Sequence, residues 1–278
     1  MIVTPAGNRT DLEREYLRVA RKSTSVPVQY GHQIALDRSV TIGQLIQSSN
    51  LFAREWIEQA LSRQLVRAPE PFDYAYLDFE PEDDFMWRST SSFTASKQEI
   101  NMLLYMLKVA KKKYPAAKWG YYSIPFLPRA TIRTPLDNDR IKRFEPLVQF
   151  ADYSIVNRYI TRNHSRLTYA QHGREVASGI KLLRDMGAPE VFVMAWHGWT
   201  RNVGDYYKML YDIAGSMDAG FWVWADCQGP WQLAFETAAF KNFASLTHSP
   251  GYVTRSFKER VASITQPILR RSPQLVGP

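Results

Sequence analysis

The strongest constraint in this sequence is an alternation of short β-rich runs with longer amphipathic stretches. Six runs rich in aromatic or β-branched residues and bounded by Pro, Gly or Asp are typical of strands: 27–33, 74–80, 118–125, 153–159, 190–197 and 221–226. Apolar residues at three- and four-residue spacing between these runs predict helices at 41–66, 96–114, 168–186, 201–217 and 231–244. This order indicates parallel strands joined by right-handed crossovers.

Two of the predicted helices carry local end signals. Residues 96–99 read Ser-Lys-Gln-Glu, a capping box that predicts a helix start at Ser96. Gly187, with Pro189 just beyond it, is a helix-stop arrangement for the stretch 168–186.

The alternation predicts an α/β fold, which could be a closed barrel or an open doubly wound sheet. No Gly-x-Gly-x-x-Gly or Gly-Lys-Ser/Thr turn follows any predicted strand, which argues against a nucleotide-binding sheet. The strand ends instead carry carboxylates, tyrosines and tryptophans, and barrel enzymes display their chemistry at the C-terminal face. We therefore predict a single TIM-like (β/α) barrel over 1–278, irregular or with fewer than eight regular strands, with a loose C-terminal tail at 267–278.

Composition excludes several classes of protein. With 45% hydrophobic and 22% charged residues the chain can bury a sizeable core, and no run approaches the roughly 20 apolar residues of a membrane span. One cysteine, Cys227, excludes an intramolecular disulfide framework, and the five histidines show no paired ligand spacing, so neither a metal nor a cofactor is expected. The first residues lack a signal-peptide pattern, which leaves the compartment open: secreted if a leader was removed, otherwise cytoplasmic.

The charge of the chain is compatible with two interpretations. Thirty-five basic and 27 acidic residues give a net charge of +8, which attracts polyanions. The alternative is an ordinary solvated basic surface. Because no nucleic-acid-binding module is recognisable, we expect no nucleic acid as partner. We also expect no membrane partner. The expected partner is a polysaccharide substrate, and the positive charge of the chain is compatible with an anionic one.

The most informative segment is 74–84, which reads Tyr-Ala-Tyr-Leu-Asp-Phe-Glu-Pro-Glu-Asp-Asp. Side chains alternate along a strand, so Tyr76, Asp78 and Glu80 share one face and the apolar residues between them share the other. Two carboxylates at i and i+2 lie about 7 Å apart at their Cα atoms, and in a partly dry site the pKa of one of them rises. A carboxylic acid of raised pKa is what protonation of a glycosidic oxygen requires. The alternative is an ion-paired or helix-capping acidic cluster.

Aromatic residues gather at the ends of several predicted strands. Sugars have apolar C–H faces edged by hydroxyl groups, so aromatic rings that carry a polar group stack well against them. The alternative for any single ring is that it fills the barrel core. The candidate substrate-binding residues of this kind, with their polar neighbours, are Tyr76, Tyr121, Tyr122, Trp196, His197, Trp222, Trp224 and Asp226.

These motifs resemble, in the same order, those of the hyaluronidases of glycoside hydrolase family 56. That family has an irregular barrel with an Asp-Phe-Glu or Asp-Trp-Glu strand end, then a Trp-Gly-Tyr-Tyr-x-x-Pro strand, then a late strand with a Val-x-Trp-type segment. The matching segments here are 77–80 (Leu-Asp-Phe-Glu), 119–125 (Trp-Gly-Tyr-Tyr-Ser-Ile-Pro) and 222–224 (Trp-Val-Trp). They span roughly 71–226.

The resemblance implies a role for each matching residue. Glu80 would be the general acid/base, and Asp78 would orient an acetamido group whose carbonyl oxygen attacks the anomeric carbon in place of an enzyme nucleophile. Trp224 would pack against the acetamido methyl group. Asn157 or Tyr159 would stand in for an active-site tyrosine of the family. Two departures are the family's disulfides, impossible with one cysteine, and its first strand, for which no counterpart is expected before Pro27.

Residues 77–80 also resemble the Asp-x-Glu strand end of the family 25 lysozymes, which cleave peptidoglycan. The sequence therefore predicts a glycoside hydrolase of the endo-N-acetylhexosaminidase, hyaluronidase-like type, retaining and substrate-assisted. The alternatives are a family 25-like muramidase and a carbohydrate-binding barrel without catalytic activity.

Overall fold

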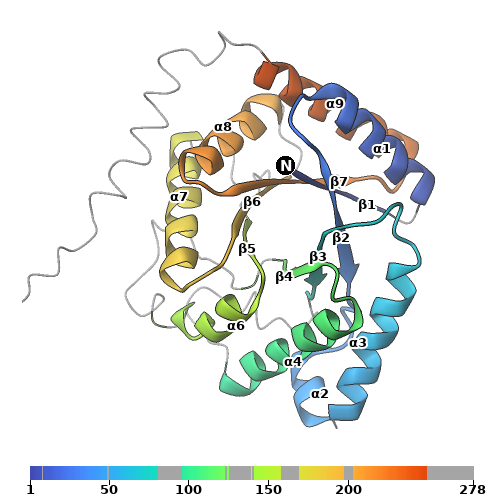
Figure 1. Cartoon of the computed structure of the whole chain (residues 1–278), viewed down its shortest axis with the longest axis vertical. Coiled ribbons are helices and arrows are strands. Elements are labelled where there is room, and N and C mark those ends of the chain that lie inside the picture. Colours follow the sequence, from blue (N-terminus) through green and yellow to red (C-terminus); the bar gives the residue numbers. More distant parts are fainter. Residues whose placement is uncertain are drawn as a thin grey trace, which may run out of the picture.

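The computed structural model describes residues 1–7, 9–48, 50–80, 96–122, 124, 139, 141–157, 169–196 and 203–248. Within these ranges, seven parallel strands form one sheet in the order β4-β3-β2-β1-β7-β6-β5, which curls into a nearly closed barrel with the helices around its outside (Figure 1). The predicted fold class is confirmed: the chain is a TIM-like α/β barrel with fewer than eight strands in its described part. The predicted tail 267–278 lies outside the described residues.

The bounds of the elements are as follows. The strands are β1 (Ile2–Ala6), β2 (Gln29–Ala35), β3 (Tyr74–Asp78), β4 (Lys118–Tyr121), β5 (Ser154–Asn157), β6 (Val191–Ala195) and β7 (Gly220–Asp226). The helices are α1 (Thr10–Ser23), α2 (Ile42–Gln47), α3 (Asn50–Leu65), α4 (Lys97–Lys113), α6 (Glu145–Phe150), α7 (Tyr169–Asp185), α8 (Val203–Ser216) and α9 (Pro230–His248). All six predicted strands are present.

The expectation that no strand precedes Pro27 is wrong, because β1 lies at the centre of the sheet between β2 and β7. Pro5 makes this strand hard to predict, because a proline inside a run of residues argues against a central strand. The structure accommodates Pro5 because β1 pairs with β2 only at Ile2 and Val3, before the proline. One residue further on, the Thr4 hydroxyl donates to the Gly31 carbonyl of β2 over 2.5 Å.

The single helix predicted at 41–66 is two helices, α2 and α3. Ser48 ends α2 in an extended conformation, and its hydroxyl donates to the Leu45 carbonyl, so a short polar side chain competes with the helical pattern. The predicted capping box of α4 is confirmed: Ser96 and Glu99 each bond the backbone N–H of the other. Gly187 closes α7 with a positive φ of 85°, as its helix-stop position predicts.

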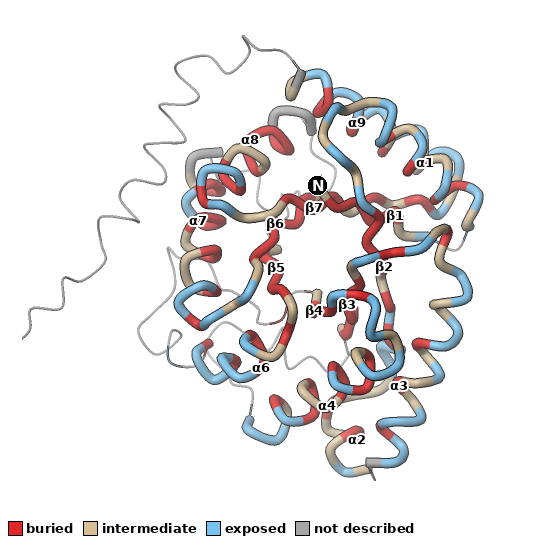
Figure 2. The backbone as a smooth tube through the Cα atoms, viewed as in Figure 1, coloured by how far each residue is buried: buried red, intermediate tan, exposed pale blue. Residues whose placement is uncertain are grey.

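The strands of the barrel are largely buried along their length, as the red colour of the tube shows (Figure 2). The outward side chains of β3, such as Ala75 and Leu77, belong to the core between barrel and helices, as the alternation predicts. The inward side chains form a separate cluster inside the barrel. Its members are Ile2, Tyr76, Tyr153, Ile155, Phe192, Met194 and Trp222.

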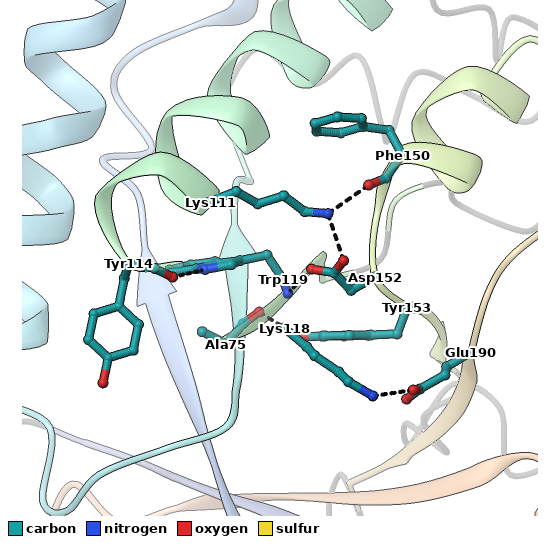
Figure 3. Close-up of polar contacts among 9 residues, drawn as sticks. All are labelled: Ala75, Lys111, Tyr114, Lys118, Trp119, Phe150, Asp152, Tyr153 and Glu190. Atoms are coloured by element: carbon teal, nitrogen blue, oxygen red, sulfur yellow. Dashed lines mark hydrogen bonds and ion pairs between the residues drawn. The ribbon is translucent and has the colours of Figure 1, made fainter. Parts of the chain in front are cut away.

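The seam between β4 and β5 is held by side chains (Figure 3). The Asp152 N–H donates to the Trp119 carbonyl over 2.9 Å, and the Trp119 N–H donates to Asp152 Oδ2 over 2.8 Å. Lys111 Nζ holds the other oxygen of Asp152 at 2.7 Å. The Tyr153 hydroxyl reaches across the seam and donates to the Ala75 carbonyl of β3 over 2.5 Å. The barrel is thus tied together where the strand ladder is interrupted.

Gly120 is what lets Tyr153 cross the seam. A Cβ atom at residue 120 would lie 2.6 Å from Tyr153 Cε2 and 2.8 Å from the Tyr153 carbonyl oxygen. We expect Gly120→Ala to lower the free energy of unfolding by about 1–3 kcal/mol, the usual cost of overpacking, as measured by urea denaturation. Gly215→Ala on α8 is the control, because a Cβ there meets nothing within 4 Å. Equal stability of the two variants would contradict this account of the seam.

Candidate active site

The carboxyl ends of three strands bring one carboxylate, one amide and one indole together. Asp78 ends β3, Gln33 lies near the end of β2, and Trp224 lies near the end of β7. Gln33 Nε2 donates to Asp78 Oδ2 over 2.5 Å, and Trp224 Nε1 donates to Gln33 Oε1 over 3.1 Å. Gln33 therefore joins the carboxylate to the indole across β2.

Gln33 was missed by the sequence analysis. The predicted strand 27–33 ends on this residue, so the signal available was a polar side chain at the carboxyl end of a strand. The register between β2 and β3 determines which residue Gln33 lies beside. Gln33 is the Cα partner of Tyr76, and Ala35 is the partner of Asp78. The long amide of Gln33 therefore comes beside Asp78.

The two carboxyl groups of the predicted pair have different surroundings. Asp78 is only 7% exposed, and burial, followed by the charge of Glu80, raises its pKa from 3.8 to about 7. Its Oδ1 atom is buried and has no hydrogen-bond partner among the described residues. Glu80 forms an ion pair with Arg38 at 2.5 Å, in which the glutamate side chain is 18% and the arginine 62% exposed. Asp78 is therefore a buried carboxyl group of raised pKa, while Glu80 is paired with the Arg38 cation.

Two further aromatic rings pack near this group, one against Trp224 and one against Tyr76. Trp196, immediately after β6, packs edge-on against Trp224 with ring centroids 5.3 Å apart. Tyr122, immediately after β4, lies 6.0 Å from Tyr76, ring centroid to ring centroid. Of the predicted site residues, the structure thus gathers Trp196 and Trp224 beside the Gln33 bridge.

Tyr76 and Trp222 lie inside the barrel, where both are fully buried. Their rings pack against each other with centroids 5.5 Å apart, and the Trp222 indole donates to the Thr4 hydroxyl over 2.9 Å. They form the layer beneath Asp78 and Trp224. Because both rings are buried beneath the site, they are placed to support it rather than to contact a ligand.

The structure separates Tyr121 from the other candidates. It is buried on the outer face of β4, where its hydroxyl donates to the Leu103 carbonyl of α4. Asn157 and Asp226 are half-buried at the ends of β5 and β7, and Asp226 Oδ1 accepts from the Gln228 N–H over 3.2 Å. Tyr159 and His197 lie outside the described residues.

The described residues contain no group of three or more histidine, cysteine, aspartate or glutamate side chains arranged to hold a metal ion. Within the same part of the chain, no helix combines the length and apolar character needed to cross a membrane. The polar side chains that the described part of the site presents are its carboxyl groups, Gln33 and the indoles.

Comparison with known proteins finds similarity in structure. No protein-family model matches the sequence, and no curated protein matches it significantly. Bee venom hyaluronidase superposes with a TM-score of 0.60 at 13% identity, over 86% of this chain and 99% of that chain. A candidate α-L-fucosidase from Bacteroides thetaiotaomicron gives 0.46 at 12% identity, over 94% and 91% of the two chains. A glucosidase from Croceicoccus marinus gives 0.38 at 13% identity, over 80% and 50%.

At this identity the superposition on bee venom hyaluronidase shows a shared barrel fold and nothing finer. The indoles at the carboxyl ends of its strands are side chains of the kind that bind sugars.

Proposed function

We propose that this chain is a glycoside hydrolase that cleaves N-acetylhexosamine linkages in a polysaccharide by a retaining, substrate-assisted route. The observation that carries the proposal is the carboxyl pair Asp78 and Glu80 at the end of β3, in which the pKa of Asp78 is raised to about 7. Trp224 beside the pair supplies a ring for the sugar. The fold similarity to bee venom hyaluronidase supports an N-acetylhexosamine polysaccharide as the substrate class.

In the first step, the carbonyl oxygen of the substrate's acetamido group forms a bond to the anomeric carbon as the glycosidic C–O bond breaks. The bonding electrons leave with the glycosidic oxygen, which takes a proton from Glu80. The acetamido N–H of the cyclic intermediate donates to the Asp78 carboxylate, and Trp224 packs against the acetamido methyl group. The substrate supplies its own nucleophile, so one carboxylate is left to orient it.

In the second step, water attacks the anomeric carbon from the face that the leaving group vacated. Glu80, now ionised, takes the proton of this water, and the bond to the acetamido oxygen breaks. Two inversions at the anomeric carbon give net retention.

The pair must hold one proton for this sequence of steps. In the free protein, Arg38 favours ionised Glu80, and burial favours protonated Asp78. An acetamido N–H at Asp78 needs an acceptor there, so substrate binding moves the shared proton to Glu80. The leaving group then receives it.

The first experiment is the release of new reducing ends from hyaluronan by the whole chain between pH 3.5 and 8. Release by the wild type and not by Glu80→Gln would support the proposal. Release from peptidoglycan but not from hyaluronan would replace it with a muramidase. Sugar binding without turnover at any pH would replace it with a non-catalytic carbohydrate-binding barrel.

The pH dependence of turnover follows from the raised pKa. We expect kcat/KM to fall about tenfold per pH unit above about pH 7, because the pair then loses the proton that the leaving group needs. Arg38→Met removes a cation that favours the ionised carboxylates, so it should move this alkaline limb upward. A rate that is constant between pH 6 and pH 9 would contradict the one-proton mechanism.

A further inference from the structure

The orientation of the Gln33 amide is fixed by its hydrogen-bond partners. An amide oxygen and nitrogen have similar shapes, so their assignment depends on their partners. The Trp224 indole N–H is a donor only, so the Gln33 atom that faces it must be the oxygen. The NH₂ group then faces Asp78, as the 2.5 Å contact from Nε2 to Oδ2 requires.

This orientation makes the two oxygens of Asp78 unequal. Oδ2 accepts an N–H from Gln33 and stays an acceptor whether Asp78 is ionised or protonated. Oδ1 is buried without a hydrogen-bond partner among the described residues. A proton on Asp78 therefore lies on Oδ1, because a proton on Oδ2 would meet the NH₂ group of Gln33.

We propose that Gln33 is a positioning residue that makes Oδ1 the working oxygen of Asp78 and ties its orientation to Trp224. Oδ1 is then the atom that carries the proton when Asp78 is protonated, while Oδ2 is held by Gln33. This role in catalysis rests on the proposed function, whereas the unequal oxygens rest only on the hydrogen bonds. Trp224, which would contact the sugar, thus orients the carboxyl group through Gln33.

The test is a carboxyl titration that needs no substrate. The ¹³Cγ signal of Asp78, identified by its loss in Asp78→Asn, is followed by NMR from pH 4 to pH 9 in the wild type, Gln33→Met and Gln33→Glu. Gln33→Met removes the donor that favours ionised Asp78, so the Asp78 midpoint should rise by about one pH unit or more. Gln33→Glu keeps the length of the side chain and the acceptor for Trp224, and its carboxylate should raise the midpoint as well. The Trp224 indole N–H signal should move in Gln33→Met and stay close to its wild-type position in Gln33→Glu.

Gln29→Met is the matched control, because Gln29 is exposed at the other end of the same strand. It should leave the Asp78 titration and the turnover unchanged. In an active enzyme, kcat of Gln33→Met should fall about 100-fold with KM within about threefold, and the alkaline limb should move with the Asp78 midpoint.

The outcomes separate this inference from the proposed function. An Asp78 midpoint that does not move in folded Gln33→Met and folded Gln33→Glu would overturn the inference, even if the wild type hydrolyses hyaluronan. A shifted midpoint in a protein that cleaves no polysaccharide would support the hydrogen-bond arrangement and refute the hydrolase. A shifted midpoint together with normal kcat would overturn the role of Gln33 in catalysis.

Discussion

Glu80→Gln is expected to lower kcat on an N-acetylhexosamine polysaccharide by at least about 1,000-fold. Glutamine has nearly the same shape and can still accept a hydrogen bond from Arg38, but it cannot carry the proton for the leaving group or take one from water. Reducing-end release measures the effect. The loss should be smaller for a substrate with a good leaving group, because its first step does not need the acid.

The fold should survive this substitution, since the Glu80 side chain lies in a partly exposed ion pair at the end of the barrel. Glu70→Gln is the matched control, because Glu70 also forms a partly exposed pair with an arginine, Arg21 of α1. It should retain wild-type turnover. A folded Glu80→Gln variant with a near-normal rate would refute the assignment of the acid.

Asp78→Asn is expected to stabilise the protein at alkaline pH while it lowers activity. The pKa of Asp78 is raised by burial from 3.8 to about 7, so the folded state binds this proton more tightly than the unfolded state does. The stability that the proton supplies is fully present below about pH 4 and is lost as pH rises through about 7. Three pH units correspond to about 4 kcal/mol, which is the largest gain expected for the variant at pH 8.

Urea denaturation of both proteins at pH 4 and pH 8 measures this gain. Glu13 of α1 also has a pKa raised to about 7 by burial, so it titrates in the same range. Because Glu13 is present in both proteins, the difference between them isolates Asp78. Glu13→Gln is the control that should flatten the pH dependence of stability without changing turnover. An advantage of Asp78→Asn that is equal at both pH values would contradict a raised pKa at Asp78.

The activity of Asp78→Asn should fall by about 100-fold or more, because the acetamido group loses the carboxylate that stabilises its developing charge. Reducing-end release measures this loss. Substrates that lack the acetamido group should be cleaved poorly by the wild type. Equal cleavage of such substrates would contradict the substrate-assisted route.

Several parts of the fold could be predicted because short segments encode them. The alternation in 74–80 predicts which side chains of β3 share a face, and Tyr76 and Leu77 do lie on opposite sides of the strand. The capping box at Ser96 and the glycine at Gly187 mark helix ends through interactions within a few residues. Such signals do not depend on the rest of the chain.

Other parts could not be predicted because they depend on which strands become neighbours. β1 pairs with β7 from the far end of the chain, and Pro5 is acceptable only because β2 has diverged by that point. Tyr121 and Tyr122 are adjacent in the sequence, yet Tyr121 packs against α4 and Tyr122 against the barrel interior. The start of β4 relative to its neighbours decides which of the two faces inward.

The sequence by itself determined the barrel class and placed Asp78 and Glu80 at the end of one strand, because side-chain periodicity is a local property. Only the tertiary structure decided the surroundings of this pair. Gln33 comes to Asp78 from β2, Trp224 comes to Gln33 from β7, and Arg38 comes to Glu80 from beyond the end of β2. Strand order and register set these neighbours, and burial among them raises the pKa of Asp78. The neighbours of the pair and the raised pKa of Asp78 depend on residues far apart in the sequence, so no single segment encodes them.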